Sequence, residues 1–487
     1  MTRVLEFIVA IILVFIAAVV VGVFLPSHGH IERSLSISHD PHQTYDLLNN
    51  FRRFDDFAGP VLKAQDPGLQ LSVSGAPYGP GAKVSWSGGM NQVPQSTLTN
   101  RSGNLDPTGK GEITWTLDSA AWRGHNKVFT LDLQPTNNQR LTKVTWSYDV
   151  DYGWNLLDRY SRFFLRGDPD TLIQYSLNHL QDQLAAIPNV DYTKTPMRIV
   201  ATPAQPILFV STQAPRTLDD VDAATAKAMQ EIDAAIKKLG VHQNGPRITI
   251  TTDYGDENYV FDVAVPIDAT SLTVNGQTVD LTKLTAQAEN APGAEPVTAG
   301  SAGVPADGSS AGAPASGASA AAPASGSSDG APPPGLTPGI VDSRGNLVVD
   351  GSVRAAMLPG GPALEGDWQG TPAGIPLMRL ALKAYSLTHG YTFDDTTHRY
   401  YDELVSLPNV AYDQQAFRVF LPLLGDDVPQ QTPEQASGKV GPLPPLNPAA
   451  WQGGNANAPE AANGSDQNAK KQENKKQAKK PAKHKRR

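Results

Sequence analysis

The sequence predicts an α+β protein with an N-terminal transmembrane helix, two folded regions and a polar, basic C-terminus. Three observations lead to this prediction. An uncharged apolar run of 19 residues occupies positions 7–25. Short alternating apolar stretches, typical of half-buried strands, are interspersed with long helical patterns. A pattern of strands and a helix also occurs twice in the second half, which indicates an internal repeat.

The amino-acid composition excludes several classes of chemistry. The 487 residues include no cysteine, which excludes disulfides, thiolate catalysis, iron–sulfur clusters and Cys-ligated zinc. The net charge of −8 divides unevenly, because residues 470–487 hold ten Lys or Arg and one Glu, a charge of +9, and leave −17 on the rest. We expect this Lys-rich end to bind an anionic lipid or an acidic envelope polymer, or only to aid solubility.

The run at 7–25 has the length of a membrane span. As a helix it would extend about 28 Å, close to the thickness of the hydrocarbon core. A cleaved signal peptide is the alternative, but its apolar region is about 7–15 residues long and ends at small residues, whereas this run ends in Phe-Leu-Pro. We therefore expect residues 1–27 to be a retained anchor, with the body in the periplasm of a bacterial inner membrane. Nucleic acid is then an improbable partner.

Two segments are expected to be disordered. Of the 45 residues at 291–335, 39 are Ala, Gly, Pro or Ser, so this stretch has little to bury. From 425 to 487 the chain is rich in Pro, Asn, Gln and Ala and becomes Lys-rich from 470. The folded material is therefore expected between about 30 and 285 and between 341 and 424.

The block at 30–188 reads as strand, helix, antiparallel strands and a long closing helix. Ile31, Leu35 and Ile37 alternate as in a strand, and Asp40-Pro41 is typical of a helix start. Five alternating stretches separated by Gly- and Asn-rich turns follow. The last helix, from Asp170, carries an apolar stripe.

This block resembles the START-like (SRPBCC, polyketide cyclase-like) family. The resemblance rests on the Asp-Pro helix start, the Phe51…Phe54…Phe57 segment, the stretch from Gly79 to Trp86, and the terminal helix. It implies a helix-grip fold, in which a curved antiparallel sheet grips the long helix around an apolar cavity. Aromatic walls hold apolar molecules, although the same residues would also serve as plain core packing. The candidate cavity residues are Trp86, Trp115, Trp146 and Tyr148.

The second region, 193–424, contains the repeat. Phe261–Ile267 matches Phe417–Leu423, and each helix of the pair, at 223–239 and 376–389, ends at a glycine. Two copies of strand, helix and two strands predict a pseudo-twofold α+β domain. The site would then lie in the cleft between the halves, with the 291–335 segment inserted between them.

The repeat region resembles the GyrI-like effector-binding domain, the ligand sensor of multidrug-responsive regulators. The most similar segments are 355–362, 368–370 and 417–422. Cation-binding members carry a Glu at the position of Arg418, so an anionic or neutral ligand is expected. If Arg418 faces the cleft, Glu365, Asp367 or a bound anion should lie within hydrogen-bond reach of it. For each candidate the alternative is a solvated charge or a core aromatic. The candidate cleft residues are Glu365, Trp368, Tyr385, Tyr401, Phe417 and Arg418.

Together these features predict a membrane-anchored protein that binds or senses a hydrophobic small molecule or lipid, without a cofactor or metal. No His-Glu-x-x-His or Gly-x-Ser-x-Gly motif is present. The first alternative is an enzyme, a cyclase or hydrolase acting on a cyclic or hydrophobic substrate, with Glu365 and Tyr401 as its acid/base pair. The second is a structural protein whose pockets are filled by its own side chains.

Overall fold

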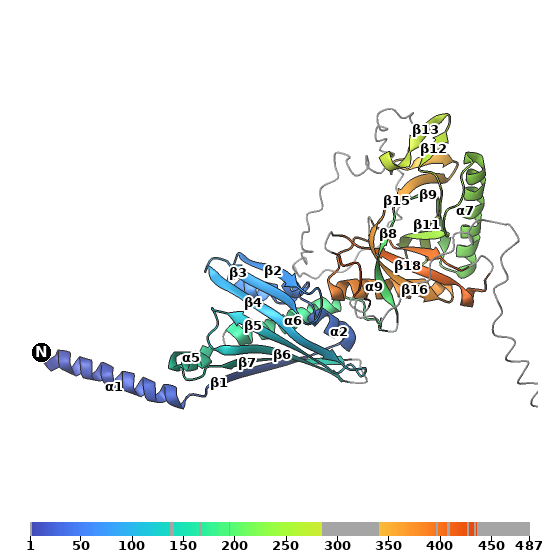
Figure 1. Ribbon diagram of the computed structural model, residues 1–487. Coiled ribbons are helices and arrows are strands. Elements are labelled where there is room, and N and C mark those ends of the chain that lie inside the picture. The colour runs from blue at the N-terminus through green and yellow to red at the C-terminus, as the bar shows by residue number, and fades with distance from the viewer. Residues whose placement is uncertain are drawn as a thin grey trace, which may run out of the picture.

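The computed structural model describes residues 2–136, 141–164, 168–193, 195–284, 340–395, 398–406, 410–425, 428–432 and 435. The predicted insertion at 291–335 and nearly all of the predicted C-terminal tail, including its Lys-rich end, lie outside these residues. The described chain forms an N-terminal helix and two antiparallel sheets, each with its own helices (Figure 1).

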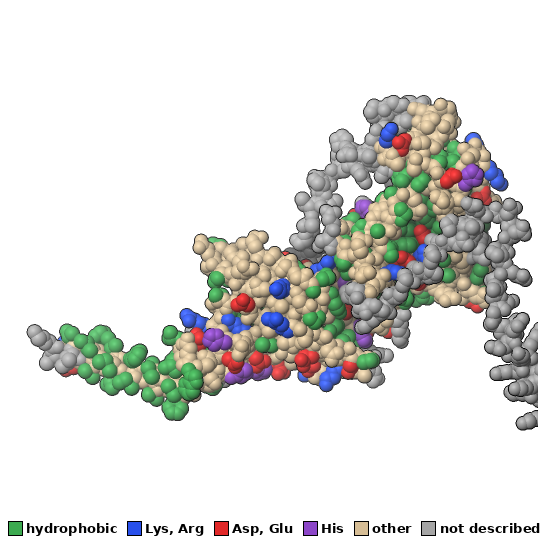
Figure 2. Space-filling model, in the orientation of Figure 1, with side chains coloured by type: hydrophobic (Ala, Val, Ile, Leu, Met, Phe, Trp, Pro, Cys, Tyr) green, Lys and Arg blue, Asp and Glu red, His purple; other side chains and the backbone are tan. Residues whose placement is uncertain are grey.

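The first helix, α1 (Thr2–Phe24), is apolar throughout and ends before Pro26. It projects away from the body of the protein, and its surface is almost entirely hydrophobic side chains (Figures 1 and 2). The stretch Glu6–Phe24 is long and apolar enough to cross a membrane, a property that it shares with N-terminal signal sequences.

The first domain is built on a seven-stranded antiparallel sheet in the order β1-β7-β6-β5-β4-β3-β2. After β1 the chain crosses to the opposite edge through three short helices and then returns strand by strand as a meander. Its strands are β1 (His28–Ile37), β2 (Leu69–Gly75), β3 (Ala82–Gly88), β4 (Val93–Leu105), β5 (Gly111–Ser119), β6 (His125–Thr136) and β7 (Leu141–Asp151).

Helices cover one face of this sheet. Asp40 caps the first of them, accepting a hydrogen bond from the His42 amide at 2.8 Å, as the Asp-Pro motif predicted. The long helix that ends the domain packs on the first helices and on β1, so the predicted element order is confirmed. The helices are α2 (Pro41–Leu48), α3 (Phe54–Phe57), α4 (Gly59–Gln65), α5 (Leu156–Tyr160) and α6 (Asp168–Ala185), with the 3-10 turn η1 (Ser161–Phe164) between the last two.

The second domain has a nine-stranded sheet in the order β14-β15-β9-β11-β10-β17-β18-β16-β8. A two-stranded hairpin, β12 (Ser271–Val274) and β13 (Gln277–Asp280), follows the first half. The nine strands are β8 (Met197–Thr202), β9 (Gln205–Pro215), β10 (Ile248–Tyr254), β11 (Asn258–Pro266), β14 (Leu347–Asp350), β15 (Val353–Leu358), β16 (Gly361–Gln369), β17 (Tyr401–Leu404) and β18 (Ala416–Pro422).

The repeat appears as the same element order in both halves. β8, β9, α7 (Leu218–Leu239), β10 and β11 correspond to β15, β16, α9 (Ile375–His389), β17 and β18. Each half therefore has two strands before its helix where the sequence analysis expected one, because Pro203 and Gly360 interrupt what would otherwise be one long strand. Both helices end, as predicted, at a glycine in the left-handed conformation.

The two halves form a single sheet by exchanging strands. β10 and β17 pair at the centre, and β15, from the second half, pairs with β9 of the first. β8, from the first half, pairs in turn with β16 of the second. The face opposite α7 and α9 carries an apolar cluster that contains residues of both halves, including Phe209 and Phe420.

The two domains share one hydrophobic core. A continuous cluster of buried side chains runs from the sheet of the first domain to α9, β16 and β18 of the second. α2 and α9 pack on each other, and Gly390 lies so close to Arg52 that a Cβ on the glycine would be 2.4 Å from the arginine Cβ. The second domain is therefore packed against the first.

Candidate ligand-binding site between the domains

The aromatic candidates of the first domain are packed against one another. Trp86, Trp115, Trp146 and Tyr148 are each at most 4% exposed. The ring centroids of Trp115 and Trp146 are 5.4 Å apart, and Phe51 lies 5.2 Å from Trp115, distances typical of direct ring contact. The indole N–H groups of Trp115 and Trp146 have no hydrogen-bond acceptor among the described residues. These four residues thus form the interior packing, and a ligand role for them stays a prediction.

Strand alternation divides the candidates of the second domain between two faces of the sheet. Trp368 and Phe417 lie on the face that packs against α9. The Trp368 indole donates to the Thr371 carbonyl at 2.9 Å, and its ring fills the space beside Gly374. The expectation that these two residues face one cleft together with Glu365 is wrong, because position 368 has the opposite parity to 365 on β16 and therefore points the other way.

Glu365, Arg418 and Tyr401 lie on the opposite face of the sheet, away from α9. Arg418 Nε lies 3.6 Å from Glu365 Oε1, and Arg198 Nε of the neighbouring strand lies 3.7 Å from the same oxygen. Burial raises the pKa of Glu365, and the two arginines oppose that rise. Arg418 thus forms an ion pair with Glu365 that is longer than a hydrogen bond, and Arg198 also pairs with Asp367.

Two charged residues of this face were missed by the sequence analysis. Arg198 comes from β8, far away in the sequence, and only the pairing of β8 with β16 places it beside Glu365. Glu403 shares a face with Tyr401, two residues earlier, so alternation along β17 was an available signal. Burial raises the pKa of Glu403 to about 7, an effect that Arg418 opposes and Glu365 and Asp402 reinforce.

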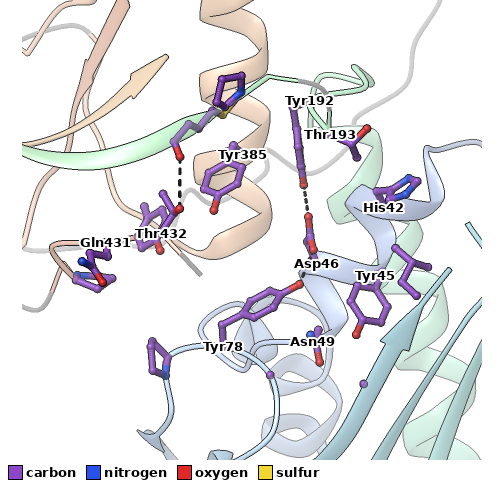
Figure 3. A pocket seen from close by; sticks show the side chains of 18 of the residues that line it. His42, Tyr45, Asp46, Asn49, Tyr78, Tyr192, Thr193, Tyr385, Gln431 and Thr432 are labelled. Carbon is purple, nitrogen blue, oxygen red and sulfur yellow. Dashed lines mark hydrogen bonds between the residues drawn. The ribbon is translucent and has the colours of Figure 1, made fainter. Parts of the chain in front are cut away.

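A cavity of about 1270 Å³ lies between the two domains, and Tyr385 is the sequence candidate that lines it (Figure 3). The first domain contributes α2, the turn at 77–80 and part of β4, and the second contributes α9 and the segment at 429–432. The chain that connects the domains supplies Tyr192 and Thr193. Its aromatic lining residues are His42, Tyr45, Tyr78, Tyr192, Tyr385 and Tyr391.

Asp46 of α2 is the acceptor at the centre of this lining (Figure 3). Its Oδ1 accepts from the Tyr78 hydroxyl at 2.5 Å and its Oδ2 from the Tyr192 hydroxyl at 2.7 Å. Burial, reinforced by the negative charge of Asp46, raises the pKa of both tyrosines well above 10. Both phenols therefore stay protonated and act as donors at neutral pH.

On the α9 side of the cavity, the lining residue Tyr385 stacks on the ring of His389. The ring centroids of Tyr385 and His389 are 3.8 Å apart and nearly parallel, and Tyr192 lies 5.4 Å from Tyr385. His389 Nε2 of α9 lies 4.0 Å from Asp46 Oδ2 of α2. Across the cavity, burial raises the pKa of Tyr45 to about 12.

Sequence analysis did not identify Asp46, Tyr78 or Tyr192, because each comes from a different element and none belongs to a motif. All residues of α2 except His42 are buried, including the polar Gln43, Thr44 and Asp46, although a helix this short normally keeps one polar face in solvent. This burial follows from the packing of α9 on α2, which the sequence of the helix does not show.

No protein-family model and no curated protein matches this chain. Solved structures that match are a Thermobifida fusca protein (16% identity, 32% of this chain, 93% of that chain, TM-score 0.25) and Thalictrum norcoclaurine synthase with a transition-state analogue (10%, 32%, 95%, 0.24). The Zhui aromatase/cyclase of Streptomyces sp. R1128 also matches (14%, 32%, 94%, 0.24). Each of these structures matches about a third of this chain, with TM-scores of 0.25 or lower, and neither domain is assigned to a family.

Proposed function

We propose that this protein is a membrane-anchored binding protein that holds a hydrophobic small molecule or lipid between its two domains. The observation that carries the proposal is the cavity of about 1270 Å³ lined by tyrosine rings from both domains around Asp46. Sites for drug-sized ligands are about 300–1,000 Å³ and combine apolar walls with a few polar groups. This cavity is large enough for such a ligand.

The polar groups of the cavity favour a ligand that carries a hydrogen-bond donor at one end. The hydroxyls of Tyr78 and Tyr192 already donate to Asp46. Asp46 thus places a negative charge at the centre of the lining. A ligand amine would meet an opposite charge there, whereas a carboxylate would meet a like charge. The proposed ligand is therefore largely apolar, with a hydrogen-bond donor at one end.

The charged face of the second domain is proposed as a second position, for an anionic or neutral ligand. Arg418 and Arg198 flank Glu365 there, and Tyr401 stacks on Phe420 with ring centroids 4.6 Å apart. Guanidinium groups suit carboxylates and phosphates. Burial raises the pKa of Tyr401, so its hydroxyl holds its proton at neutral pH. A protonated hydroxyl can donate to a bound ligand or act as a general acid, so acid/base catalysis by Glu365 and Tyr401 remains the alternative.

The first experiment asks whether the cavity is occupied. The full chain is purified in detergent, extracted with organic solvent, and the extract is analysed by mass spectrometry. Thr193 lines the cavity but is exposed, so Thr193→Trp should block the space without harming the fold, and Thr193→Ser is the matched control. We expect a lipid-like molecule from the natural and Ser proteins, and at least a several-fold loss from Thr193→Trp. Equal recovery from all three would contradict the cavity as the site.

A second experiment separates the two positions. The chain is titrated with a lipophilic cation dye and with an anionic fluorescent fatty acid. Arg418→Ala should weaken the fatty acid only, because it removes a positive charge from the sheet face, and Thr193→Trp should weaken the cation dye only. Cation binding that is unchanged in Thr193→Trp, without any fatty-acid binding to the natural protein, would overturn both assignments.

A further inference from the structure

The segment that connects β7 to α6 exposes large apolar side chains beside the N-terminal helix. Trp154 is 85% exposed, Leu157 72% and Phe163 65%. All three lie within ten residues, on or next to α5 and η1. Large apolar groups gathered this closely on a surface usually mark an interaction site.

This α5–η1 segment (residues 154–164) packs directly against α1 (Figure 1). The Tyr160 hydroxyl donates to the Ala18 carbonyl at 2.5 Å. Gly22 permits the close approach, since a Cβ at that position would lie 3.1 Å from Tyr160 Cε2 and 3.3 Å from Leu156 Cδ2. The segment that exposes these apolar side chains is therefore held beside the apolar helix α1.

Arg159 links the α5–η1 segment to the C-terminal end of α1 by hydrogen bonds. Its Nη1 donates to the carbonyls of Val23 at 2.8 Å and Leu25 at 3.2 Å, and its Nε donates to Gly153 at 2.8 Å. The last carbonyls of a helix have no partner within the helix and carry its negative dipole end, so a buried guanidinium stabilises them. This contact holds the segment at a fixed position along α1.

That position lies below the membrane surface if α1 crosses the bilayer. Ala18 is seven residues before Leu25, which corresponds to about 10 Å along the helix. The hydroxyl of Tyr160 would thus reach the outer part of the hydrocarbon layer. Tryptophan and tyrosine favour this boundary because their side chains combine an apolar ring with a polar group that can reach water.

We propose that the α5–η1 segment is a second membrane-contact element, which inserts Trp154, Leu157 and Phe163 into the headgroup and acyl boundary of the bilayer that α1 crosses. The inference rests on the membrane anchoring in the proposed function. Its consequence is orientation, because two contacts at fixed positions hold the first domain against the lipid surface, where a single helix would let it rotate.

The test uses the absence of cysteine in the chain, which makes single labelling sites straightforward. Leu157→Cys and Phe163→Cys each carry a nitroxide in the full-length protein, reconstituted in phosphatidylcholine and phosphatidylglycerol vesicles. Met90→Cys, on a turn between β3 and β4 and 79% exposed, is the water-facing control, and Val14→Cys on α1 is the lipid-facing control. Collisions with oxygen report lipid exposure, and collisions with a water-soluble nickel chelate report water exposure.

We expect labels at 157 and 163 to give an oxygen-to-nickel ratio several-fold above that at 90 and close to that at 14. A ratio at 157 and 163 equal to that at 90, with 14 in lipid, overturns this inference and leaves the anchor intact. A water-exposed label at 14 overturns the anchor itself. Labels at 157 and 163 shielded from both reagents would mean that a protein covers the segment, which also overturns the inference.

A second variant tests the contact with α1. Gly22→Val places a branched side chain where Tyr160 and Leu156 approach the helix, so it should push the α5–η1 segment away. The label at 157 should then become more accessible to nickel while the label at 14 stays in lipid. If the accessibility of the label at 157 to nickel did not change, packing on α1 would not set the depth of the segment. That result would contradict the proposed role of the contact with α1.

Discussion

The two sheets use their faces in different ways. In the first domain the inner face carries aromatic rings that contact one another and the helices, with Trp115 and Trp146 at the centre. In the second domain, the face away from the helices carries both an apolar cluster and the charged groups Arg198, Glu365, Arg418 and Glu403. One face is stabilised by ring packing, and the other holds buried charges.

The difference shows where each domain can tolerate a ligand. Rings from one sheet and its own helices interdigitate and leave little room, as protein interiors generally do. On the second sheet, Arg418 and Arg198 lie 3.6 and 3.7 Å from Glu365, and buried charges of this kind are stabilised only when they are paired. Between the domains both arrangements occur, because Tyr78 stacks on His389 with ring centroids 5.3 Å apart while Tyr78 and Tyr385 also line the cavity.

The largest effect is expected in the ring-packed interior. Trp115→Ala should lower the free energy of unfolding by about 3–5 kcal/mol, because it removes a fully buried ring and leaves a void. Chemical denaturation of the detergent-solubilised chain measures the loss. Trp115→Phe is the control and should cost much less, since it keeps a ring and removes an indole N–H without an acceptor among the described residues. If Trp115→Ala lowered the unfolding free energy by less than about 1 kcal/mol, the interior around Trp115 would not be tightly packed.

The charged face should make stability depend on pH through Glu403. Burial raises its pKa from 4.5 to about 7, so the folded protein holds this proton up to a higher pH than the unfolded chain does. Its contribution to stability is therefore complete below about pH 4.5 and is lost as the pH rises to 7 and above. Glu403→Gln should be more stable than the natural protein at pH 8, by up to about 3 kcal/mol, and similar at pH 4.5.

Denaturation curves between pH 4.5 and 8 measure this difference. Glu112→Gln, which changes an exposed glutamate in the first domain, is the matched control and should run parallel to the natural protein. If the Glu403→Gln curve also ran parallel, the charged face would be solvated and the contrast with the first domain would disappear.

The junction between the two regions should show an intermediate effect. The Tyr192 hydroxyl bonds both Asp46 and, at 2.9 Å, Thr388 of α9, so Tyr192→Phe leaves two buried groups without that partner. We expect a loss of about 1–3 kcal/mol in unfolding free energy. Tyr78→Phe, which removes the interactions with Asp46 and Asn49 but leaves the Tyr192–Thr388 bond in place, should cost less. Equal losses of unfolding free energy in the two variants would mean that the Tyr192–Thr388 hydrogen bond does not stabilise the protein.

The smallest effect should come from shortening the segment between the halves of the second domain. Replacing 291–335 with a short Gly/Ser link should change the stability by about 1 kcal/mol or less, since loop closure costs only about 0.6 kcal/mol per doubling of length. Thermal unfolding measures it. Residues 193–285 alone should fail to fold, because β9 and β10 would lose β15 and β17 as partners. A stable, monomeric half would contradict the description of one shared sheet.

The sequence by itself determined the local elements. The apolar run of α1, the Asp-Pro start of α2, the alternating strands and the glycine ends of α7 and α9 were all predicted, because each depends on the periodicity and conformational preferences of neighbouring residues. The repeat followed from the same patterns. Parity along β16 is a local property too, and it alone assigns Trp368 and Glu365 to opposite faces, because side chains an odd number of positions apart on a strand point in opposite directions.

Tertiary structure decided which residues meet. Arg198 and Glu365 are adjacent only because the two halves exchange strands, and Asp46 acquires Tyr78, Tyr192 and His389 only because the second domain docks on α2. Whether an aromatic ring fills a core or lines a cavity depends in the same way on segments more than a hundred residues apart. Such contacts follow from packing and strand pairing across the whole chain, which the local sequence pattern does not encode.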